Sequence, residues 1–178
     1  MTFVQRALTE LAAYTPSDAA QKEALRSIVA VLDTVSEPHL RSTLAPGHLT
    51  ASAVLRDPTA GRVLLISHEK IGRWLQPGGH IELSDRSLLD AARREVAEEV
   101  GSLAIVNRGI VDVDIHQIPG FDVEPPHLHF DVRFLVDVGA GRPVVGPGSL
   151  GYRWVCLADI DSLDTDDSVV RLLHKALA

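Results

Sequence analysis

Three glutamates, Glu95, Glu98 and Glu99, lie close together near the middle of the sequence. If residues 88–100 form an α-helix, the spacings of three and four residues place their carboxylates within an arc of about 100°. Carboxylates at these spacings repel one another unless a positive charge lies between them. Oxygen ligands on one rigid element suit a hard divalent cation such as Mg²⁺. A charged helix face exposed to solvent is the alternative, and the three glutamates alone leave both open.

Caps and an apolar stripe predict the helix that carries these glutamates. Ser87, followed three residues later by Asp90, resembles a capping box, and Gly101 follows the last turn. An apolar stripe runs beside the glutamates and consists of Leu89, Ala92, Val96 and Val100. Such a stripe packs on a sheet, so the carboxylates are expected at the border of the core, where a cleft can form.

A glycine pair, Gly78 and Gly79, precedes this helix. The segment 73–82 resembles a short strand that breaks at Pro77 and the two glycines. Glycine lets the backbone approach a ligand closely, and it can direct carbonyl or amide groups towards that ligand. An ordinary turn would also account for the pair.

The other patterns predict a mixed α/β or α+β fold. Helical patterns cover residues 3–37 and 168–177. Runs 48–57 and 61–69 flank a turn and predict a hairpin, and 104–118, 126–138 and 151–160 are further strand candidates. Strands outnumber helices and lie between them, which favours this class.

Polar and apolar residues alternate in the segment 127–136. Leu128, Phe130, Val132, Phe134 and Val136 form one face, and the other carries His127, His129, Asp131 and Arg133. The polar face could simply meet water, as in many antiparallel sheets. The functional alternative is that His127, His129 and Arg133, joined by His80, line a substrate cleft and counter the charge of phosphates.

A chain of 178 residues holds one sizeable core. We therefore predict an N-terminal helical extension over residues 1–40 and one domain over 41–178. The extension has an apolar stripe, formed by Leu25, Ile28, Val29 and Leu32. It either covers the core of the domain or pairs with a second copy of the chain as a homodimer.

Composition narrows the classes of partner. A formal net charge of −7 argues against a protein that grips nucleic acid through its phosphates. The one cysteine, Cys156, cannot form an intrachain disulfide, which favours a reducing compartment. No apolar run is long enough for a membrane span, and the first residues lack a signal-peptide pattern. We expect a cytoplasmic protein without a membrane partner.

Residues 79–101 resemble the Nudix box, in which a glycine, a glutamate, an Arg-Glu pair, an aliphatic residue, a Glu-Glu pair and a second glycine follow at set spacings. The matching positions are Gly79, Arg94, Glu95, Val96, Glu98, Glu99 and Gly101. Asp85 replaces the upstream glutamate, and eight residues rather than seven separate it from Arg94, so Glu82 could take its place. Ser102 follows Gly101 where the family favours an apolar residue.

The resemblance implies an α/β/α sandwich around a mixed sheet and a bound Mg²⁺ or Mn²⁺. By analogy the metal ligands would be Glu95, Glu98, Glu99 and the carbonyl of Gly78, with Arg94 orienting the glutamates. The implied reaction is hydrolysis of the diphosphate linkage in a small nucleoside diphosphate-X type molecule. Glu98 is the first candidate for the general base, and Glu124 is the second.

Three other activities are compatible with the same fold. The isomerase of isopentenyl diphosphate needs a cysteine before the box, and the chain has none before Cys156. A nucleotide-binding sensor without catalysis commonly loses box glutamates, and this chain keeps those of the helix. RNA decapping is disfavoured by the net charge. The substrate is open among nucleoside triphosphates, sugar nucleotides, dinucleoside polyphosphates and coenzyme-type diphosphates.

Overall fold

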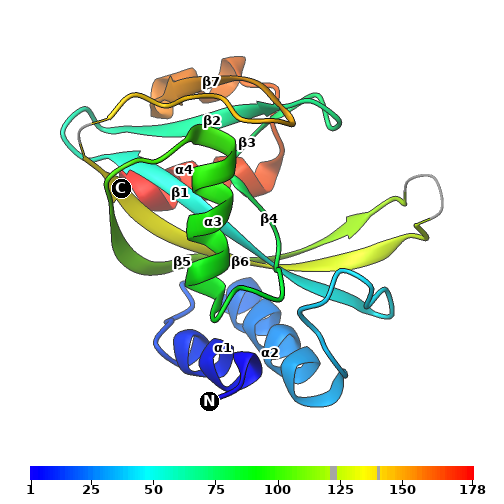
Figure 1. The fold of residues 1–178 in the computed structure, drawn as a ribbon. Coiled ribbons are helices and arrows are strands. Elements are labelled where there is room, and N and C mark those ends of the chain that lie inside the picture. The colour runs from blue at the N-terminus through cyan, green and yellow to red at the C-terminus, as the bar shows by residue number, and fades with distance from the viewer. Residues whose placement is uncertain (121–123, 140) are drawn as a thin grey trace.

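A computed structural model describes residues 1–120, 124–139 and 141–178 of the chain (Figure 1). Its helices are α1 (Phe3–Ala12), α2 (Ala19–Thr34), α3 (Leu88–Val100), the 3₁₀ helix η1 (Leu157–Ser162) and α4 (Asp167–Leu177). Its strands are β1 (Gly47–Asp57), β2 (Arg62–His68), β3 (Trp74–Leu75), β4 (Gly78–His80), β5 (Ile105–Ile118), β6 (His127–Val138) and β7 (Ser149–Val155). Within these residues, no helix is both long and apolar enough to cross a membrane.

Side-chain caps fix where the four α-helices begin. The residue before each helix is extended and accepts a backbone N–H of the first turn; these residues are Thr2, Asp18, Ser87 and Asp166. Such caps satisfy donors that the helix itself leaves unpaired. At α3 the predicted Ser87 cap is confirmed, although Asp90 bonds Arg86 instead of completing a capping box.

The seven strands form one mixed sheet. Its main path runs β3-β2-β1-β6-β5, with β4 added on β1 and β7 on β2. The pair β1–β6 is parallel, and all other pairs are antiparallel. The predicted hairpin is confirmed as β1 and β2, and β5 and β6 form a second, longer antiparallel pair.

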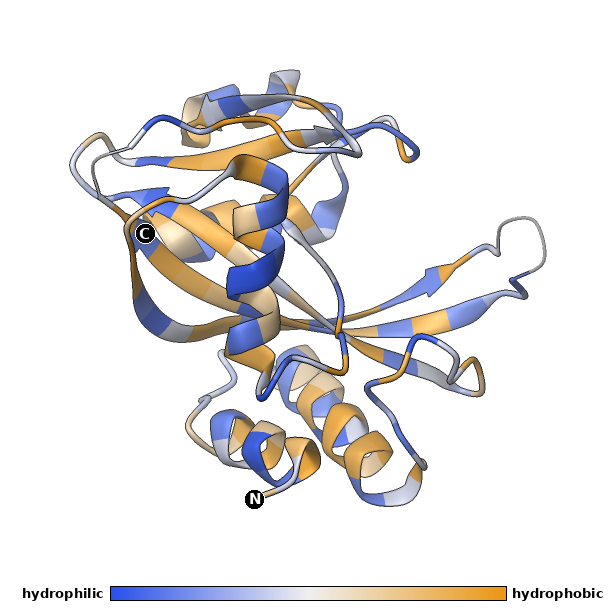
Figure 2. Ribbon diagram, in the orientation of Figure 1, coloured by the Kyte–Doolittle hydropathy of each residue, from blue (hydrophilic) through white to orange (hydrophobic). Residues whose placement is uncertain are grey.

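Both faces of this sheet are covered by helices. On β2, Leu64 and Ile66 belong to the core beneath α1, α2 and α3, whereas Val63 and Leu65 belong to the core beneath α4. This alternation follows from the period of two in a strand. Helix α3 lies in front of the sheet and α4 behind it (Figure 1), and β1 and β2 are largely apolar between them (Figure 2). The predicted α/β/α sandwich is confirmed.

The expected break lies at Gln76 and Pro77, between β3 and β4, whereas the glycine pair itself does not break a strand. Gly78 and Gly79 lie within β4, where they pair with Ser52 and Ala51 of β1. A Cβ added to Gly78 would lie 2.6 Å from the Cα of Ser52, so only glycine permits this close approach. The two glycines therefore extend the sheet towards α3 instead of ending a strand.

The first two helices cover the core. Ala7 of α1 and Ile28 of α2 are fully buried in the cluster that also contains the α3 side chains. The amide of Gln21 donates to the carbonyl of Val113 on β5 at 3.0 Å and accepts the N–H of Val113 at 3.2 Å. Glu10 of α1 accepts the N–H groups of Leu88 and Leu89 at the start of α3. The division of the chain at residue 40 stays a prediction.

We expect Ile28→Ala to lower the free energy of unfolding by about 2–5 kcal/mol, because it removes a fully buried side chain and leaves a cavity. Arg26→Ala, on the exposed face of the same helix, should change it by less than about 0.5 kcal/mol. Urea unfolding of both variants measures the difference. Equal effects, or proteolytic removal of residues 1–40 without a fall in Tm, would contradict the packing of this helix.

Candidate active site

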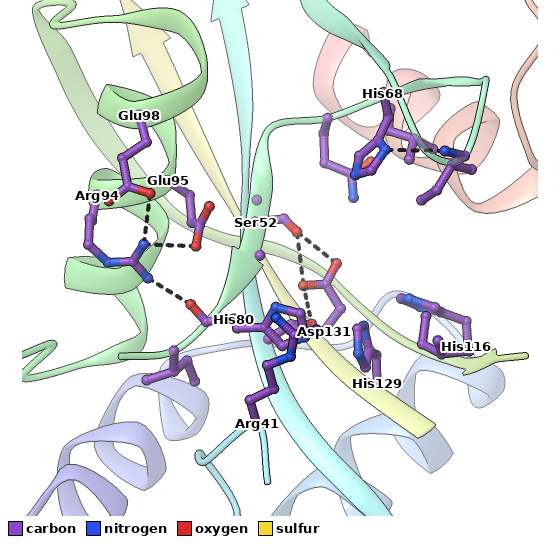
Figure 3. A pocket seen from close by; sticks show the side chains of 18 of the residues that line it. Arg41, Ser52, His68, His80, Arg94, Glu95, Glu98, His116, His129 and Asp131 are labelled. Carbon is purple, nitrogen blue, oxygen red and sulfur yellow. Dashed lines mark hydrogen bonds and ion pairs between the residues drawn. The ribbon is translucent and has the colours of Figure 1, made fainter. Parts of the chain in front are cut away.

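A cleft of about 530 Å³ lies where α3, β4 and the polar face of the sheet meet. Its acidic side comes from α3, with Glu95 and Glu98, and the glycine pair of β4 forms its edge. Figure 3 shows these groups on one side and the polar residues of β1, β5 and β6 on the other. That second side consists of Thr50, Ser52, His116, His129 and Asp131. Carboxylates and imidazoles therefore face the same space from opposite sides.

Arg94 organises the acidic side. Its Nη1 donates to Glu95 Oε1 at 2.9 Å and to Glu98 Oε2 at 3.2 Å. Its Nη2 donates to the carbonyl of His80 at 2.7 Å. The planar guanidinium offers several donors in one fixed fork, so a single side chain sets the positions of two carboxylates and of β4.

Asp85 holds the opposite side of the same guanidinium. Its Oδ2 lies 3.0 Å from Nη2 of Arg94, its Oδ1 accepts Nε at 3.2 Å, and the side chain is 5% exposed. It also accepts the N–H of Glu82 at 2.8 Å, which closes the loop before α3. Glu82 itself is mostly exposed and comes only within 3.9 Å of Arg94. In spite of the extra residue in the box, Asp85 is therefore the partner of Arg94, and it does not line the cleft.

Glu99 and Gly79, two further positions of the box, each contact another residue of the site. The N–H of Gly78 donates to Glu99 Oε2 at 2.9 Å, and burial raises the pKa of Glu99 to about 7. A Cβ on Gly79 would lie 2.8 Å from the carboxylate carbon of Glu95, so glycine gives this carboxylate its space. Burial also raises the pKa of Glu95, an effect that Arg94 opposes.

Glu95 and Glu98 share Nη1 of Arg94, whereas Glu99 accepts the N–H of Gly78. Among the described residues, the group whose potential ligand atoms come together is instead His48, His80 and His129, all within 4.8 Å of one another. Repulsion between neighbouring carboxylates, together with the bonds to Arg94 and Gly78, accounts for the spread of the glutamates.

The predicted histidines divide between two places. His80 and His129 line the cleft, whereas His127 does not; its Nδ1 bonds the carbonyl of Pro125 and its Nε2 lies 3.3 Å from Nε2 of His129. Burial lowers the pKa of His80 to about 4 and that of His129 to about 2. Both rings are therefore neutral at neutral pH. They can offer hydrogen bonds or lone pairs to a ligand, but no positive charge to a phosphate.

Arg133 does not line this cleft, and the polar face of β6 does not simply meet water. The Arg133 side chain is 2% exposed, and its Nε donates to Asp131 at 2.8 Å. Its Nη atoms bind Asp112 of β5 and Ser168 of α4. Buried charge requires such pairing, and these bonds commit the guanidinium to joining β5, β6 and α4.

Arg41 is a cleft residue that sequence reasoning missed. It lines the cleft and its Nη2 lies 2.8 Å from Glu124 Oε1, with the Arg41 side chain 59% exposed. Glu124 does not line the cleft, and it borders residues 121–123, which lie outside the described part of the chain. Arg41 stands between predicted elements, where no periodic pattern marks a role. It brings a guanidinium to the cleft, where that group is paired with Glu124.

The chain is similar to known proteins in sequence and in fold. The NUDIX domain family model matches residues 46–174. A Lactococcus lactis protein named "Probable DHNTP pyrophosphohydrolase" is 34% identical over 123 residues, which are 67% of this chain and 72% of that protein. A solved structure from Clostridium perfringens, titled a hydrolase of the NUDIX family, is 25% identical with a TM-score of 0.58, covering 73% of this chain and 95% of that one.

A further solved structure shares the fold alone. The dihydroneopterin triphosphate pyrophosphohydrolase of E. coli is 19% identical with a TM-score of 0.57. The match covers 72% of this chain and 94% of that chain.

We expect Arg94→Met to lower the free energy of unfolding by about 3 kcal/mol, because it leaves the buried carboxylate of Asp85 without its cation. Adding Asp85→Asn should recover part of this loss. Arg86→Met is the matched control, since its pair with Asp90 is mostly exposed and should be worth less than about 1 kcal/mol. Urea unfolding of the parent and these three variants tests this, and similar losses in Arg94→Met and Arg86→Met would refute the anchoring role.

Proposed function

The chain belongs to the NUDIX family and is a pyrophosphohydrolase of the NUDIX type, and on this premise we propose that it needs Mg²⁺ or Mn²⁺ to cleave a diphosphate linkage in a nucleoside diphosphate-X type molecule. The arrangement that carries the proposal is the pair Glu95 and Glu98, fixed by Arg94 at the edge of the cleft. It lies beside the glycines of β4, whose missing Cβ atoms let Ser52 and the carboxylate of Glu95 come close to the strand.

The donor set fits a hard divalent cation. In the described chain, hydrogen bonds and ion pairs engage one carboxylate oxygen of each glutamate: Oε1 of Glu95, Oε2 of Glu98 and Oε2 of Glu99. The second oxygen of each is left for a cation. Because the amide and carbonyl of one strand residue point to the same edge, the carbonyl of Gly78 lies on the side of α3, as its amide does. Carboxylates and a carbonyl are the ligands that Mg²⁺ prefers.

The residues of the chain then have distinct roles in hydrolysis. A cation bound there would neutralise charge on the bridging oxygens and lower the pKa of an attacking water. Glu98 faces the cleft with a side chain that is 54% exposed, so it can accept the proton of that water. Arg94 keeps Glu98 and Glu95 in place. Glu124 stays the second candidate for the base. It does not line the cleft, but it pairs with Arg41, which does.

The substrate is proposed by chemical class. Arg41 supplies positive charge at the cleft for a phosphate, and the neutral rings of His80 and His129 supply hydrogen bonds. The name of the Lactococcus relative makes DHNTP the first compound to test. A Mg²⁺-dependent hydrolysis screen, with identified products, would compare DHNTP with nucleoside triphosphates, sugar nucleotides, dinucleoside polyphosphates and coenzyme-type diphosphates.

We expect Glu98→Gln to reduce kcat by about 100-fold or more on the best substrate of this screen, because the amide keeps the shape but cannot accept a proton. Glu23→Gln, on the exposed face of α2, is the matched control and should keep full activity. Steady-state kinetics with Mg²⁺ and with a chelator measures both effects. A Glu98→Gln enzyme as fast as the parent would rule out this base.

We expect Glu99→Gln to separate the cost of buried charge from the gain of cation binding. Its pKa, raised from 4.5 to about 7, means that the free energy of unfolding falls as the pH rises through this range. At pH 8 with a chelator, the variant should therefore melt no lower than the parent. The Mg²⁺-induced gain, about 2.7 kcal/mol at a hundredfold excess over Kd, should shrink. Calorimetry at pH 8 tests this, and an equal Mg²⁺ shift in parent and variant would exclude Glu99 as a ligand.

A further inference from the structure

Five histidines gather at the side of the cleft opposite α3. They are His48 of β1, His80 of β4, His116 of β5, and His127 and His129 of β6. His48 has its ring centroid 4.8–5.1 Å from those of His80, His127 and His129. Figure 3 shows His80, His116 and His129 around Asp131. Four strands thus bring imidazoles together that are far apart in the sequence.

Three of these rings bring potential metal-ligand atoms near one another. One potential ligand atom from each of His48, His80 and His129 lies within 4.8 Å of the others. Bonds of 2.0–2.1 Å from a tetrahedral Zn²⁺ to nitrogen correspond to nitrogen–nitrogen distances of about 3.3 Å. Modest side-chain rotations would close this difference, since each ring stands on a different strand with its own rotamer.

The ring of His48 is oriented but lacks a second partner. Its Nδ1 lies 3.1 Å from the carbonyl of Thr43, and since a carbonyl only accepts, Nδ1 carries the proton. Nε2 therefore holds a lone pair, and it is buried without a hydrogen-bond partner. A buried polar atom left unpaired is costly. A histidine fixed through one nitrogen by a carbonyl, with the other nitrogen free, is the usual arrangement of a metal ligand.

The charge state of the rings fits the same role. Burial lowers the pKa of His48 and His129, so both are neutral at neutral pH. Neutral imidazole is the form that binds metal, and it suits Zn²⁺ and its transition-metal neighbours rather than Mg²⁺. The nearby carboxylate of Asp131 is already bonded by Thr50, Ser52 and Arg133, which leaves the imidazoles as the donors.

We propose that His48, His80 and His129 bind one transition-metal ion of the Zn²⁺ class, at a site separate from the glutamates of α3. His48 lies behind the other two and is fully buried, whereas His80 and His129 line the cleft. An ion held by the three rings therefore keeps its remaining coordination position towards the cleft, open to water or to a substrate oxygen. This site does not depend on the function proposed for the carboxylates.

Zn²⁺ binding in millimolar Mg²⁺ tests the proposal, because Mg²⁺ competes for carboxylates but not for imidazoles. A chelating dye that competes for Zn²⁺ should report one ion per chain. His129→Gln and His80→Gln should each weaken binding at least tenfold. His116→Gln, from the same cluster, and Glu98→Gln, from α3, should leave it unchanged. Circular dichroism checks that each variant is folded.

The unmodified chain gives a second measurement that needs no variant. Co²⁺ added in place of Zn²⁺ should give the strong visible absorption of a four-coordinate site with nitrogen ligands, and Zn²⁺ should abolish it. Failure to bind Zn²⁺ in excess Mg²⁺, or only the weak absorption of six-coordinate Co²⁺, would overturn the site. So would binding that is lost in Glu98→Gln and kept in the histidine variants.

Discussion

The guanidinium of Arg94 allows several carboxylates to lie together at one edge of a cleft, because its positive charge offsets their mutual repulsion. Its nitrogens reach Asp85 in the loop, the carbonyl of His80 on β4, and Glu95 and Glu98 on its own helix. Because the guanidinium is rigid and always charged, these contacts fix one another's positions. Helix, loop and strand thus become one unit, and the missing Cβ of Gly79 leaves space for the carboxylate at its centre.

Buried charge shapes the other half of the structure in a similar way. Arg133 and Arg171 reach Asp112 and Asp114 between the sheet and α4, and Lys175 adds a further bond to Asp112. Such pairs are costly to desolvate and costly to break, so they favour one arrangement of strand and helix over others. The same strand, β6, carries the paired charge of Arg133 and, nearer its start, the neutral imidazole of His129. The polar face of β6 therefore packs against α4 along one part of the strand and lines the cleft along another.

How much the sequence predicts depends on how local each feature is. Helix α3 was predictable because its stripe, its Ser87 cap and Gly101 all lie within the fifteen residues 87–101. The box likewise indicated Arg94 and its glutamates. Strand β4 was not predictable, because Gly78 and Gly79 indicate a turn locally and become a strand only through pairing with β1. The partners of Arg133 and Asp85 depend on packing and on loop shape, and Arg41 stands in a stretch without periodic pattern.

Glu10 gives the N-terminal helices a second role besides covering the hydrophobic core. Its carboxylate accepts the first free amides of α3, so the helix that carries the glutamates is completed by a residue lying outside the segment matched by the family. The extension is therefore bonded directly to the start of α3. A shortened chain that begins at residue 46 would have to leave these amides to solvent, and the first turn of α3 would fray. A binding partner that moved α1 away from the body would remove the same two hydrogen bonds from the start of α3.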